Sequence, residues 1–503
     1  MNRRQFLVQA PLGLAAIRST LSAAQSTLQN VQLTIDLQSS IATVPADMMG
    51  LSYESTQLGE PEVFSARNHQ LIQLFRKLSP SGVLRLGGNT SEFTFYRSSA
   101  HITAPVYKPL PTQPAQLTPI TDEALGNLRG FLEATGWSCI YGLNLGTGTP
   151  VRAADEAAAV SRILGLRLQY FQIGNEPNNY IRYKLRPSTW DVSAYFNEWL
   201  PFVQTIGQRL PTIRIGGPDM GAQREWMNVF AKRAVAALGP KFFALSDHFY
   251  AEGPPTSPTS SMDNLLRNTK IDAEIEVMQD AARVADRPIR MTEVNSCYLG
   301  GKPGVSDTFG AALWAGELSL RLVASGFSGV NFHGGSARQI KASLGGILPG
   351  DDVSNSEAAD SYYTPIAGSP IHGYTARPEF YGLMLAAQFS GSNMVRISGS
   401  HPDLKAYASV TEQKDRLQLA LFNFRGSTLT VNIDTGRPYH RVRSWPLVAP
   451  AVNATTGVTL AGVAAEKSSF APNWAKEAVI HPGMQPTLTL LPFSSLFAML
   501  HSA

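Results

Sequence analysis

The chain has 503 residues, of which 44% are hydrophobic and 16% are charged, and its formal net charge is +4. This composition excludes an intrinsically disordered protein, and the length predicts more than one hydrophobic core. The small positive excess is not gathered into a run of lysine and arginine, so we do not expect nucleic-acid binding.

The first 24 residues are predicted to be an export signal. Residues 3–7 read Arg-Arg-Gln-Phe-Leu, a twin-arginine pattern, and a modestly apolar stretch follows at 8–17. Ser22-Ala23-Ala24 is a small-x-small cleavage site. A frayed amphipathic tail is the alternative. No later stretch approaches the ~20 apolar residues of a membrane span, so we expect a soluble periplasmic or extracellular protein without a membrane partner.

Residues 46–385 are predicted to form a (β/α)8 barrel. Short apolar runs alternate there with amphipathic helical segments such as 68–78 and 153–164. Eight such repeats favour a closed parallel barrel with long loops. The predicted strands are residues 48–53, 83–86, 139–143, 170–173, 213–216, 244–249, 289–292 and 329–332. The two cysteines, Cys139 and Cys297, fall at the ends of predicted strands, and we expect no disulfide framework.

Residues 386–503 are predicted to form a β-sandwich. The helical pattern stops near residue 390, and short strand-like runs separated by Gly, Asn, Ser and Pro follow at 404–408, 417–422, 428–432 and 487–491. We expect these strands to be antiparallel. Apolar and polar residues also alternate at 31–37, within the segment 25–45. A lone strand cannot close a barrel, so we expect this segment to join the sandwich.

Two glutamates carry the expected chemistry. Glu176 follows the fourth predicted strand in Asn175-Glu176-Pro177, and Glu293 follows the seventh. The carboxyl ends of barrel strands meet at one face, so two acids placed there can reach one pocket. Two carboxylates that flank a sugar–oxygen bond suffice to hydrolyse it. A helix cap or an ion pair is the alternative for each glutamate taken alone.

Polar residues at other strand ends are expected to support these acids. Arg85 lies on the second strand, where an unpaired charge is costly, and pairing with Glu293 would keep that carboxylate ionised. Asn175 can donate to a sugar hydroxyl. His248 or Tyr250, at the end of the sixth strand, can hydrogen-bond a carboxylate or substrate, although a structural role is equally open.

Metal and cofactor sites are not expected. The nine histidines show neither HxxxH nor HxH spacing, and no histidine–cysteine cluster is present. The pairs at 87–88 and 300–301 are Gly-Gly and fit neither a dinucleotide fingerprint nor a P-loop. Amide groups at 300–301 could instead bind an anion.

These residues resemble a known group. Asn175-Glu176-Pro177 followed by a strand-end glutamate resembles the clan of retaining barrel glycosidases. The run at 293–309, Glu-Val-Asn-Ser-Cys-Tyr-Leu-Gly-Gly-Lys-Pro-Gly-Val-Ser-Asp-Thr-Phe, looks like the nucleophile region of glycoside hydrolase family 79, the β-glucuronidase and heparanase group. Residues 85–88, Arg-Leu-Gly-Gly, resemble that family's strand-two motif.

The resemblance implies roles for individual residues. Glu176 would be the acid/base and Glu293 the nucleophile, with Tyr250 supporting Glu293. Glu54 would hold sugar hydroxyls. The sugar carboxylate would be held by Tyr298, by the amides of Leu299 and Gly300, and by Tyr362 or Tyr363, between which the sequence does not choose. Leu299 stands where heparanase has glycine.

The resemblance favours an exo-acting retaining β-glucuronidase that removes terminal glucuronic acid, with or without a 4-O-methyl group. The chain lacks a long insert before the third strand such as heparanase loses on processing. We expect a monomer without cofactor, acting on a glucuronic-acid-containing carbohydrate. The alternatives are a heparanase-like endo-β-glucuronidase, a barrel glycosidase for a neutral sugar, and a non-catalytic carbohydrate-binding protein.

Overall fold

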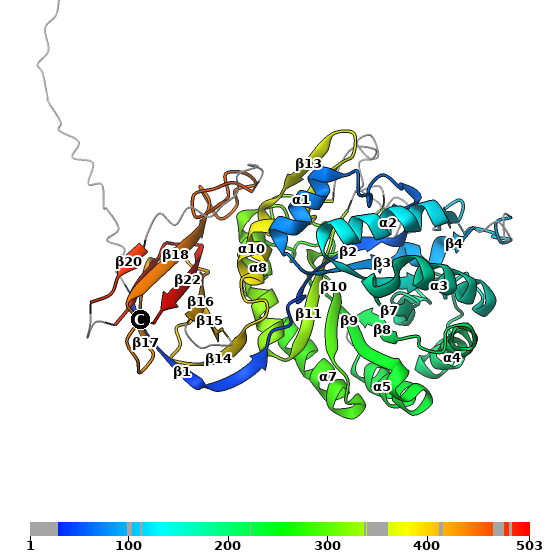
Figure 1. Cartoon of the computed structure of the whole chain (residues 1–503), viewed down its shortest axis with the longest axis horizontal. Coiled ribbons are helices and arrows are strands. Elements are labelled where there is room, and N and C mark those ends of the chain that lie inside the picture. Colours follow the sequence, from blue (N-terminus) through cyan, green and yellow to red (C-terminus); the bar gives the residue numbers. More distant parts are fainter. Residues whose placement is uncertain are drawn as a thin grey trace, which may run out of the picture.

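The computed structural model describes residues 29–97, 103–110, 113–221, 223–335, 339, 361–411, 416–465, 477–481 and 485–502. It places an α/β barrel beside a domain made of strands (Figure 1). The predicted export signal lies outside the described residues. None of the described helices is both long and apolar enough to cross a bilayer.

Eight parallel strands close the barrel, as the sequence predicted. Each predicted strand overlaps one observed strand, and pairing runs around the ring from one strand to the next. The bounds are β2 (Met49–Glu54), β3 (Val83–Gly87), β6 (Ser138–Leu143), β7 (Leu168–Ile173), β8 (Ile215–Gly221), β9 (Phe242–Glu252), β10 (Ile289–Cys297) and β11 (Phe327–His333).

Helices cover the outside of the barrel, and local sequence sets where several of them begin. The side chains of Thr121, Thr149 and Asp191 each accept an amide N–H of the following turn, which satisfies a donor that a helix leaves free at its start. The helices are α1 (His69–Leu78), α2 (Asp122–Thr135), α3 (Pro150–Leu164), α4 (Val192–Arg209), α5 (Arg224–Leu238), α6 (Met262–Leu266), α7 (Lys270–Ala285), α8 (Phe309–Ala324) and α10 (Pro378–Ala387).

Short elements that the sequence did not predict lie in the loops, most of them at the carboxyl ends of the strands and two, η3 and η5, just before β7 and β9. They are the 3-10 helices η1 (Ser55–Gly59), η2 (Asn89–Phe93), η3 (Gly165–Arg167), η4 (Pro177–Asn179) and η5 (Gly239–Lys241), the parallel pair β4 (Thr94–Tyr96) and β5 (Thr118–Ile120), and the hairpin β12 (Ile366–Ser369) and β13 (Gly373–Ala376). Among these, η2 follows the strand that carries Arg85, and η4 begins directly after Glu176.

The second domain combines both ends of the described chain, as predicted. Its ten strands form one continuous sheet, in which β1 (Gln29–Thr43) lies between β14 and β17. The other strands are β14 (Asn393–Ser398), β15 (Leu404–Val410), β16 (Arg416–Asn423), β17 (Leu429–Asp434), β18 (Arg441–Val448), β19 (Thr459–Leu460), β20 (Glu477–Val479), β21 (Thr487–Leu490) and β22 (Ser494–His501).

Strand β1 shows the alternation that the sequence predicted. Val31, Leu33, Ile35 and Leu37 are buried, and the residues between them are exposed. β15 pairs antiparallel with β16, and β17 with β21, as predicted, whereas β1, whose direction was not predicted, runs parallel to β17. The two strands belong to opposite ends of the domain's chain, so no hairpin turn constrains their direction.

Helices α8 and α10 join the two domains. Both are apolar around nearly their whole circumference, which is typical of a helix buried on all sides. The first amides of α8, at Phe309 and Gly310, donate to the carbonyls of Ala454 and Val452 in the second domain at 2.8 and 2.7 Å. Cys139 and Cys297 are both free and buried, in agreement with the absence of a disulfide framework.

Candidate active site

The carboxyl ends of the barrel strands surround one pocket of about 240 Å³. Seven of the residues predicted for the site line it, and they come from regions up to about 300 residues apart in the sequence. The lining residues are Glu54, Asn89, Glu176, Asn179, Arg182, Tyr183, Tyr250, Glu293, Tyr298, Leu299, His333 and Tyr363.

Glu176 enters the pocket from a tight turn at the end of β7. Gly174 and Glu176 have φ of 85° and 46°, in the left-handed region, and Pro177 then begins η4. The backbone N–H of Glu176 donates to the carbonyl of Asp219 at 2.8 Å, which ties the turn to β8. A left-handed conformation is costly for a glutamate, and such strain is found where the surroundings hold a functional side chain in place.

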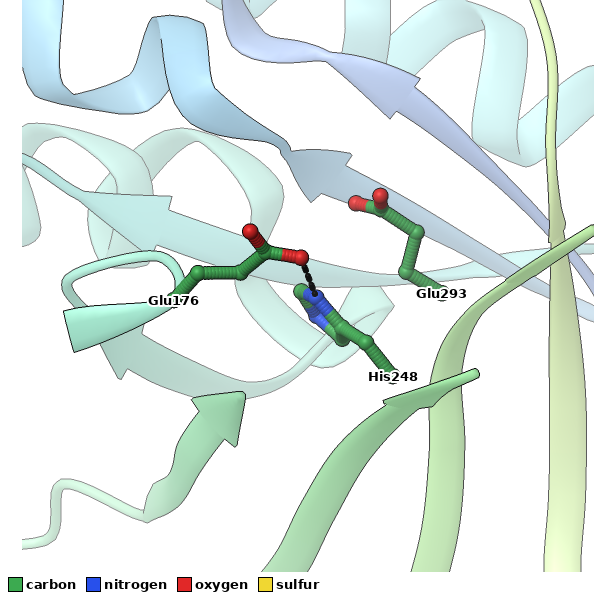
Figure 2. Close-up of side chains that lie close together, drawn as sticks. All are labelled: Glu176, His248 and Glu293. Atoms are coloured by element: carbon green, nitrogen blue, oxygen red, sulfur yellow. Dashed lines mark hydrogen bonds and ion pairs between the residues drawn. The ribbon is translucent and has the colours of Figure 1, made fainter. Parts of the chain in front are cut away.

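Glu293 lies within β10, which corrects the prediction that the strand ends at residue 292. The pairing of β10 shifts register at this point, between Met291 and Glu293 against β9. A bulge of this kind re-aims a side chain within a strand. Figure 2 shows the carboxylates of Glu176 and Glu293 turned toward each other, and carboxylate oxygens of the two lie within 4.8 Å.

Arg85 is completely buried and pairs with Glu293, as the sequence predicted. Its Nη1 lies 2.7 Å from Oε2 of Glu293, and its Nη2 contacts Asp219. Burial alone would raise the pKa of Glu293, but the nearby His333, His248 and Arg85 side chains together lower it below its ordinary value. Glu293 is therefore ionised at neutral pH.

His248 lies beneath the two glutamates and contacts Glu176 (Figure 2). Its Nδ1 is 3.1 Å from Oε1 of Glu176, and its Nε2 is 3.0 Å from Oδ1 of Asp219. Burial alone would lower the pKa of His248, but Asp219 and Glu293 outweigh burial and raise it to about 10. His248 is therefore an imidazolium at neutral pH, and both ring nitrogens donate.

Glu176, His248 and Glu293 are close enough together to be considered as metal ligands. The chemistry of the group does not fit a metal. A histidine binds a metal through a neutral nitrogen, whereas the protons of His248 are directed at Glu176 and Asp219. Arg85 also holds one oxygen of Glu293. This site suits two opposed carboxylates without an ion between them.

Tyrosines form the wall beside Glu293. The hydroxyl of Tyr250 donates to Oε1 of Glu293 at 2.8 Å. The ring of Tyr250 lies 6.3 Å from that of Tyr298 and 6.2 Å from that of Tyr363, measured between centroids. Tyr363 is buried and lines the pocket, whereas Tyr362 is 44% exposed and lies outside it. The structure therefore selects Tyr363 and removes Tyr362 from the site.

The turn after Tyr298 has an unusual backbone. Leu299, Gly300 and Gly301 all have left-handed φ, of 63°, 86° and 84°. Leu299 lines the pocket in a conformation that glycine adopts freely and leucine does not. Gly300 is not among the residues that line the pocket, and its carbonyl accepts the backbone N–H of Tyr362 at 2.7 Å.

Two further predicted residues are placed differently from each other. Glu54 ends β2 and lines the pocket, where it accepts the amide and hydroxyl of Thr90 at 2.9 and 2.7 Å. Asn175 is buried behind the lining. Its Oδ1 accepts from Arg85 at 2.7 Å and its Nδ2 donates to Asn89 at 2.8 Å, so Asn89 faces the pocket in its place.

Several site residues were missed from the sequence. Asp219, in the Gly-Gly-Pro-Asp run of β8, was overlooked because this strand was expected to end at residue 216. Asn89 follows the Arg-Leu-Gly-Gly motif directly, and its position was an available signal. His333 ends β11. Asn179, Arg182 and Tyr183 come from the loop after Glu176, and nothing in the local sequence shows that this loop turns back over the pocket.

Comparison with known proteins confirms the resemblance to β-glucuronidases and heparanases. The chain is 26% identical over 311 residues to a β-glucuronidase of Aspergillus niger, covering 56% of this chain and 55% of that one. It is 27% identical over 282 residues to a β-glucuronidase of Neurospora crassa, covering 50% of each. Heparanase of Gallus gallus is 23% identical over 347 residues, covering 58% of this chain and 64% of that one.

The chain thus spans about half the length of the curated β-glucuronidases it matches. No family model matches it. Among solved structures, a 4-O-α-L-rhamnosyl-β-D-glucuronidase from Fusarium oxysporum has a TM-score of 0.68 at 19% identity, covering 92% of this chain and 99% of that one. An α-L-arabinofuranosidase from Thermotoga maritima has a TM-score of 0.63 at 15% identity, covering 94% and 100%. These likenesses establish the fold, a glycosidase-type barrel with a β-domain.

Proposed function

We propose that this chain, a relative of the family 79 β-glucuronidases and heparanases, is a retaining exo-acting β-glucuronidase. One observation carries the catalytic part of the proposal. The fourth and seventh barrel strands bring Glu176 and Glu293 into one pocket with carboxylate oxygens within 4.8 Å. Retaining glycosidases place the two carboxyl groups about 5–5.5 Å apart, whereas inverting ones leave about 6.5–9.5 Å for a water. The observed spacing supports retention.

The first half of the reaction uses the ionised Glu293 as nucleophile. Its carboxylate attacks the anomeric carbon, and the bond from that carbon to the leaving oxygen breaks. The electron pair goes to the leaving oxygen, which takes a proton from Glu176. Arg85 and Tyr250 hold the nucleophile in place at 2.7 and 2.8 Å.

The second half releases the sugar with its original anomeric configuration. The ester cancels the charge of Glu293, and Glu176, which gave up its proton in the first half, accepts a proton from water. The water oxygen bonds to the anomeric carbon, and the bond to Glu293 breaks, returning Glu293 as a carboxylate. Arg85 and the hydroxyl of Tyr250 then stabilise the restored charge of Glu293 without reorganisation, because they already contact this carboxylate in the free protein.

The proposed sugar is a terminal β-D-glucuronic acid, with or without a 4-O-methyl group. The relatives named β-glucuronidase support this identity. Tyr298, Leu299 and Tyr363 line the pocket beside Glu293 and offer hydroxyl and amide donors for the sugar carboxylate. Hydroxyl and amide groups recognise an anion without adding a cation next to the nucleophile. The pocket volume of about 240 Å³ suits one sugar ring at the cleaved bond.

Export by a twin-arginine signal is also part of the proposal. The pattern at residues 3–24 supports it, and the two free cysteines suit a protein that needs no oxidative folding before transport. Amino-terminal sequencing of protein recovered outside the cytoplasm tests this: cleavage after Ala24 is expected. A full-length chain retained in the cytoplasm would contradict it.

The enzymatic proposal is tested with a panel of 4-nitrophenyl glycosides. We expect kcat/KM on the β-D-glucuronide to exceed that on the β-D-glucoside, β-D-xyloside and α-L-arabinofuranoside by at least about 10³-fold, because an unmatched polar site rejects substrates that lack its partner group. Proton NMR early in the reaction should show the β-anomer first. Preference for a neutral sugar would support a barrel glycosidase of that kind, and release of the α-anomer first would exclude retention.

Endo action and simple binding are separated by the same approach. An oligosaccharide with an internal glucuronic acid should resist hydrolysis, and one with a terminal glucuronic acid should release the monosaccharide. Internal cleavage would indicate a heparanase-like enzyme. Sugar binding without any hydrolysis would indicate a non-catalytic carbohydrate-binding protein.

A further inference from the structure

The carboxylate of Glu176 has a second set of contacts on the side opposite His248. Its Oε2 accepts the side-chain amide of Asn179 at 2.9 Å and the hydroxyl of Tyr183 at 3.1 Å. Both residues belong to the chain that follows Glu176, and both line the pocket. Neither contact is required for the double displacement described above.

Tyr183 is itself the end of a longer run of hydrogen bonds that starts at Arg85. Nη2 of Arg85 donates to Oδ1 of Asn175 at 2.7 Å. Nδ2 of Asn175 donates to Oδ1 of Asn89 at 2.8 Å, and Nδ2 of Asn89 donates to the Tyr183 oxygen at 3.3 Å. The run therefore links the residue that holds the nucleophile to the residue that protonates the leaving group.

The direction of this run is determined by its ends. A guanidinium donates and cannot accept, and a carboxylate accepts and cannot donate. Each asparagine between them must then accept with its oxygen and donate with its nitrogen. Tyr183 accepts from Asn89, so its own proton is free to point at Glu176. A hydrogen bond to an ionised carboxylate is about twice as strong as one to a neutral acceptor, so the run favours ionised over protonated Glu176.

The loop that carries Tyr183 is fixed on both sides. The hydroxyl of Tyr180 donates to the buried Glu92 at 2.6 Å, and the indole of Trp190 donates to the carbonyl of Pro177 at 2.8 Å. The guanidinium of Arg186 donates to the carbonyl of Gly146 at 2.9 Å. A hydroxyl held this way is pre-positioned, and little ordering entropy opposes its contact with Glu176.

We propose that Tyr183 is a positioning residue that acts through Glu176, favouring its ionised form when it serves as base in the second half of the reaction. The inference rests on the proposed function. The effect of Tyr183 differs between the two halves of the reaction because the charges near Glu176 change. Before the ester forms, the ionised Glu293 opposes the ionisation of Glu176. After it forms, that repulsion is gone, and Arg85 has lost one of its two anionic partners.

Other groups face Glu176 from every side of the pocket. His248 reaches Oε1 from β9 at 3.1 Å, Glu293 and Tyr250 lie across the pocket on β10 and β9, and Arg182 lines the pocket on the same loop as Tyr183. Substitution of Tyr183 by phenylalanine leaves all of these charges in place. A shift in pH dependence of that variant then reports the lost hydroxyl alone.

The test is Tyr183→Phe, assayed on an aryl glucuronide with a good leaving group and on one with a poor leaving group. With the good leaving group the second half limits kcat, and we expect kcat to fall about 3–10-fold while kcat/KM stays within about twofold. Loss of the hydroxyl should shift the acid limb of the pH profile of kcat and the alkaline limb of the pH profile of kcat/KM to higher pH, both by about 0.5–1 unit. A purely structural role would lower both parameters without moving either limb.

The run of hydrogen bonds is tested with Asn89→Ala and the double variant. Asn89→Ala should move the limbs in the same direction by less, and the double variant should match Tyr183→Phe alone, because Asn89 acts on Glu176 through the hydroxyl. Additive shifts, or no shift in Tyr183→Phe, would overturn the inference. If Tyr183→Phe does not fold, as judged by its unfolding transition, Asn89→Ala becomes the test. The inference is then overturned if the pH limbs of Asn89→Ala do not move.

Tyr439→Phe is a matched control. It removes a hydrogen-bonded tyrosine hydroxyl from the second domain, where Arg437 donates to it at 2.9 Å, and should leave the pH profile unchanged. Failure of the inference is distinct from failure of the proposed function. If only the inference fails, the wild-type protein hydrolyses glucuronides and the pH limbs of the variants do not move. If the proposed function fails, the wild-type protein hydrolyses no glucuronide.

Discussion

At the scale of single residues, the site is an alternation of opposite charges. Asp219 lies between Arg85 and His248, and each of these cations in turn contacts one of the two glutamates. Buried charges are tolerated when each has a hydrogen-bonded partner, and removal of one leaves the others exposed to the full cost of burial.

The two catalytic glutamates should respond differently to truncation. Glu293→Ala is expected to abolish turnover on every glucuronide, because no other group forms the ester. Glu176→Ala should cost about 10²–10⁴-fold on a poor leaving group, which needs protonation, and far less in kcat/KM on a dinitrophenyl glucuronide, which does not. Steady-state kinetics on both substrates provide the measurement. Equal losses of kcat/KM for the two substrates would exclude Glu176 as the acid.

Asp219→Asn should lower the pKa of His248 from its value of about 10. A histidine with a raised pKa stabilises the fold fully below its unfolded value near 6.5, and this contribution is lost as the pH rises toward 10. The variant should lack that decline and be less stable by about 3 kcal/mol at pH 6, because a buried pair is broken. NMR titration of the imidazole and thermal unfolding report both effects. An unchanged titration would show that Asp219 does not set the charge of His248.

At the scale of elements, the sequence predicted the barrel strands because the hydrophobic periodicity and the positions of the turn residues indicate the same strands. For the same reason it placed Arg85, His248 and Glu293 with the correct strands and Glu176 directly after the fourth one. Strand ends were less predictable. Polar residues such as Asp219 and Asn295 lie inside β8 and β10, since a barrel interior can satisfy them, and the sequence pattern treats them as loop.

Contacts between loops could not be predicted at all. Tyr183 reaches Asn89, 94 positions away, and Tyr363 reaches the turn at Gly300. These pairs depend on how the loops after β3, β7, β10 and β11 fold over the barrel mouth, and no local periodicity encodes that path. The choice between Tyr362 and Tyr363 is of this kind, because neighbouring residues have the same local sequence and opposite burial.

Helix α3 carries a buried carboxyl group that should make stability depend on pH. Glu156 accepts the hydroxyl of Tyr141 at 2.7 Å, and burial raises the pKa of Glu156 from 4.5 to about 7. A raised folded pKa means that the contribution of Glu156 is fully present below 4.5 and is lost as the pH rises through 7. Glu156→Gln keeps an oxygen for Tyr141 and removes this loss.

We therefore expect Glu156→Gln to match the wild type at pH 4 and to exceed its free energy of unfolding by up to about 3 kcal/mol above pH 8. Denaturant unfolding at several pH values measures the difference. The control Glu133→Gln changes an exposed glutamate on α2 that pairs with Arg129, and should shift stability by less than about 0.5 kcal/mol at any pH. A constant difference between Glu156→Gln and wild type would show that Glu156 does not titrate in this range.

At the scale of the whole molecule, the two domains share their cores. Phe422, Trp445 and Phe497 of the second domain pack in the same hydrophobic cluster as helices α8 and α10. Tyr407 donates to the buried Glu317 of α8 at 2.5 Å. An interface of this kind predicts one cooperative unit, since neither domain can bury these helices alone.

Removal of β1 should therefore disrupt more than one strand. Deletion of residues 29–37 removes the part of β1 that pairs with β17 and with residues 396–398 of β14, together with four buried side chains, Val31, Leu33, Ile35 and Leu37. At roughly 1.5–3 kcal/mol for each buried aliphatic side chain, the loss approaches the whole stability of a typical domain. We expect aggregation or a single transition at much lower temperature, measured by calorimetry. An unchanged transition would show that the sheet is complete without β1.

The position of β1 also bears on how the chain reaches its final form. Thr43 at the end of this strand hydrogen-bonds Asn393, 350 positions later. At a synthesis rate of about 5–20 residues per second, the first strand waits on the order of 20–70 s before its neighbours exist. During that interval the apolar side chains of this strand have no partners to pack against. In any chain truncated before residue 393 they remain exposed. A chain that has lost its last quarter would thus expose an unpaired strand near the opposite terminus, where quality-control proteases and chaperones can bind it.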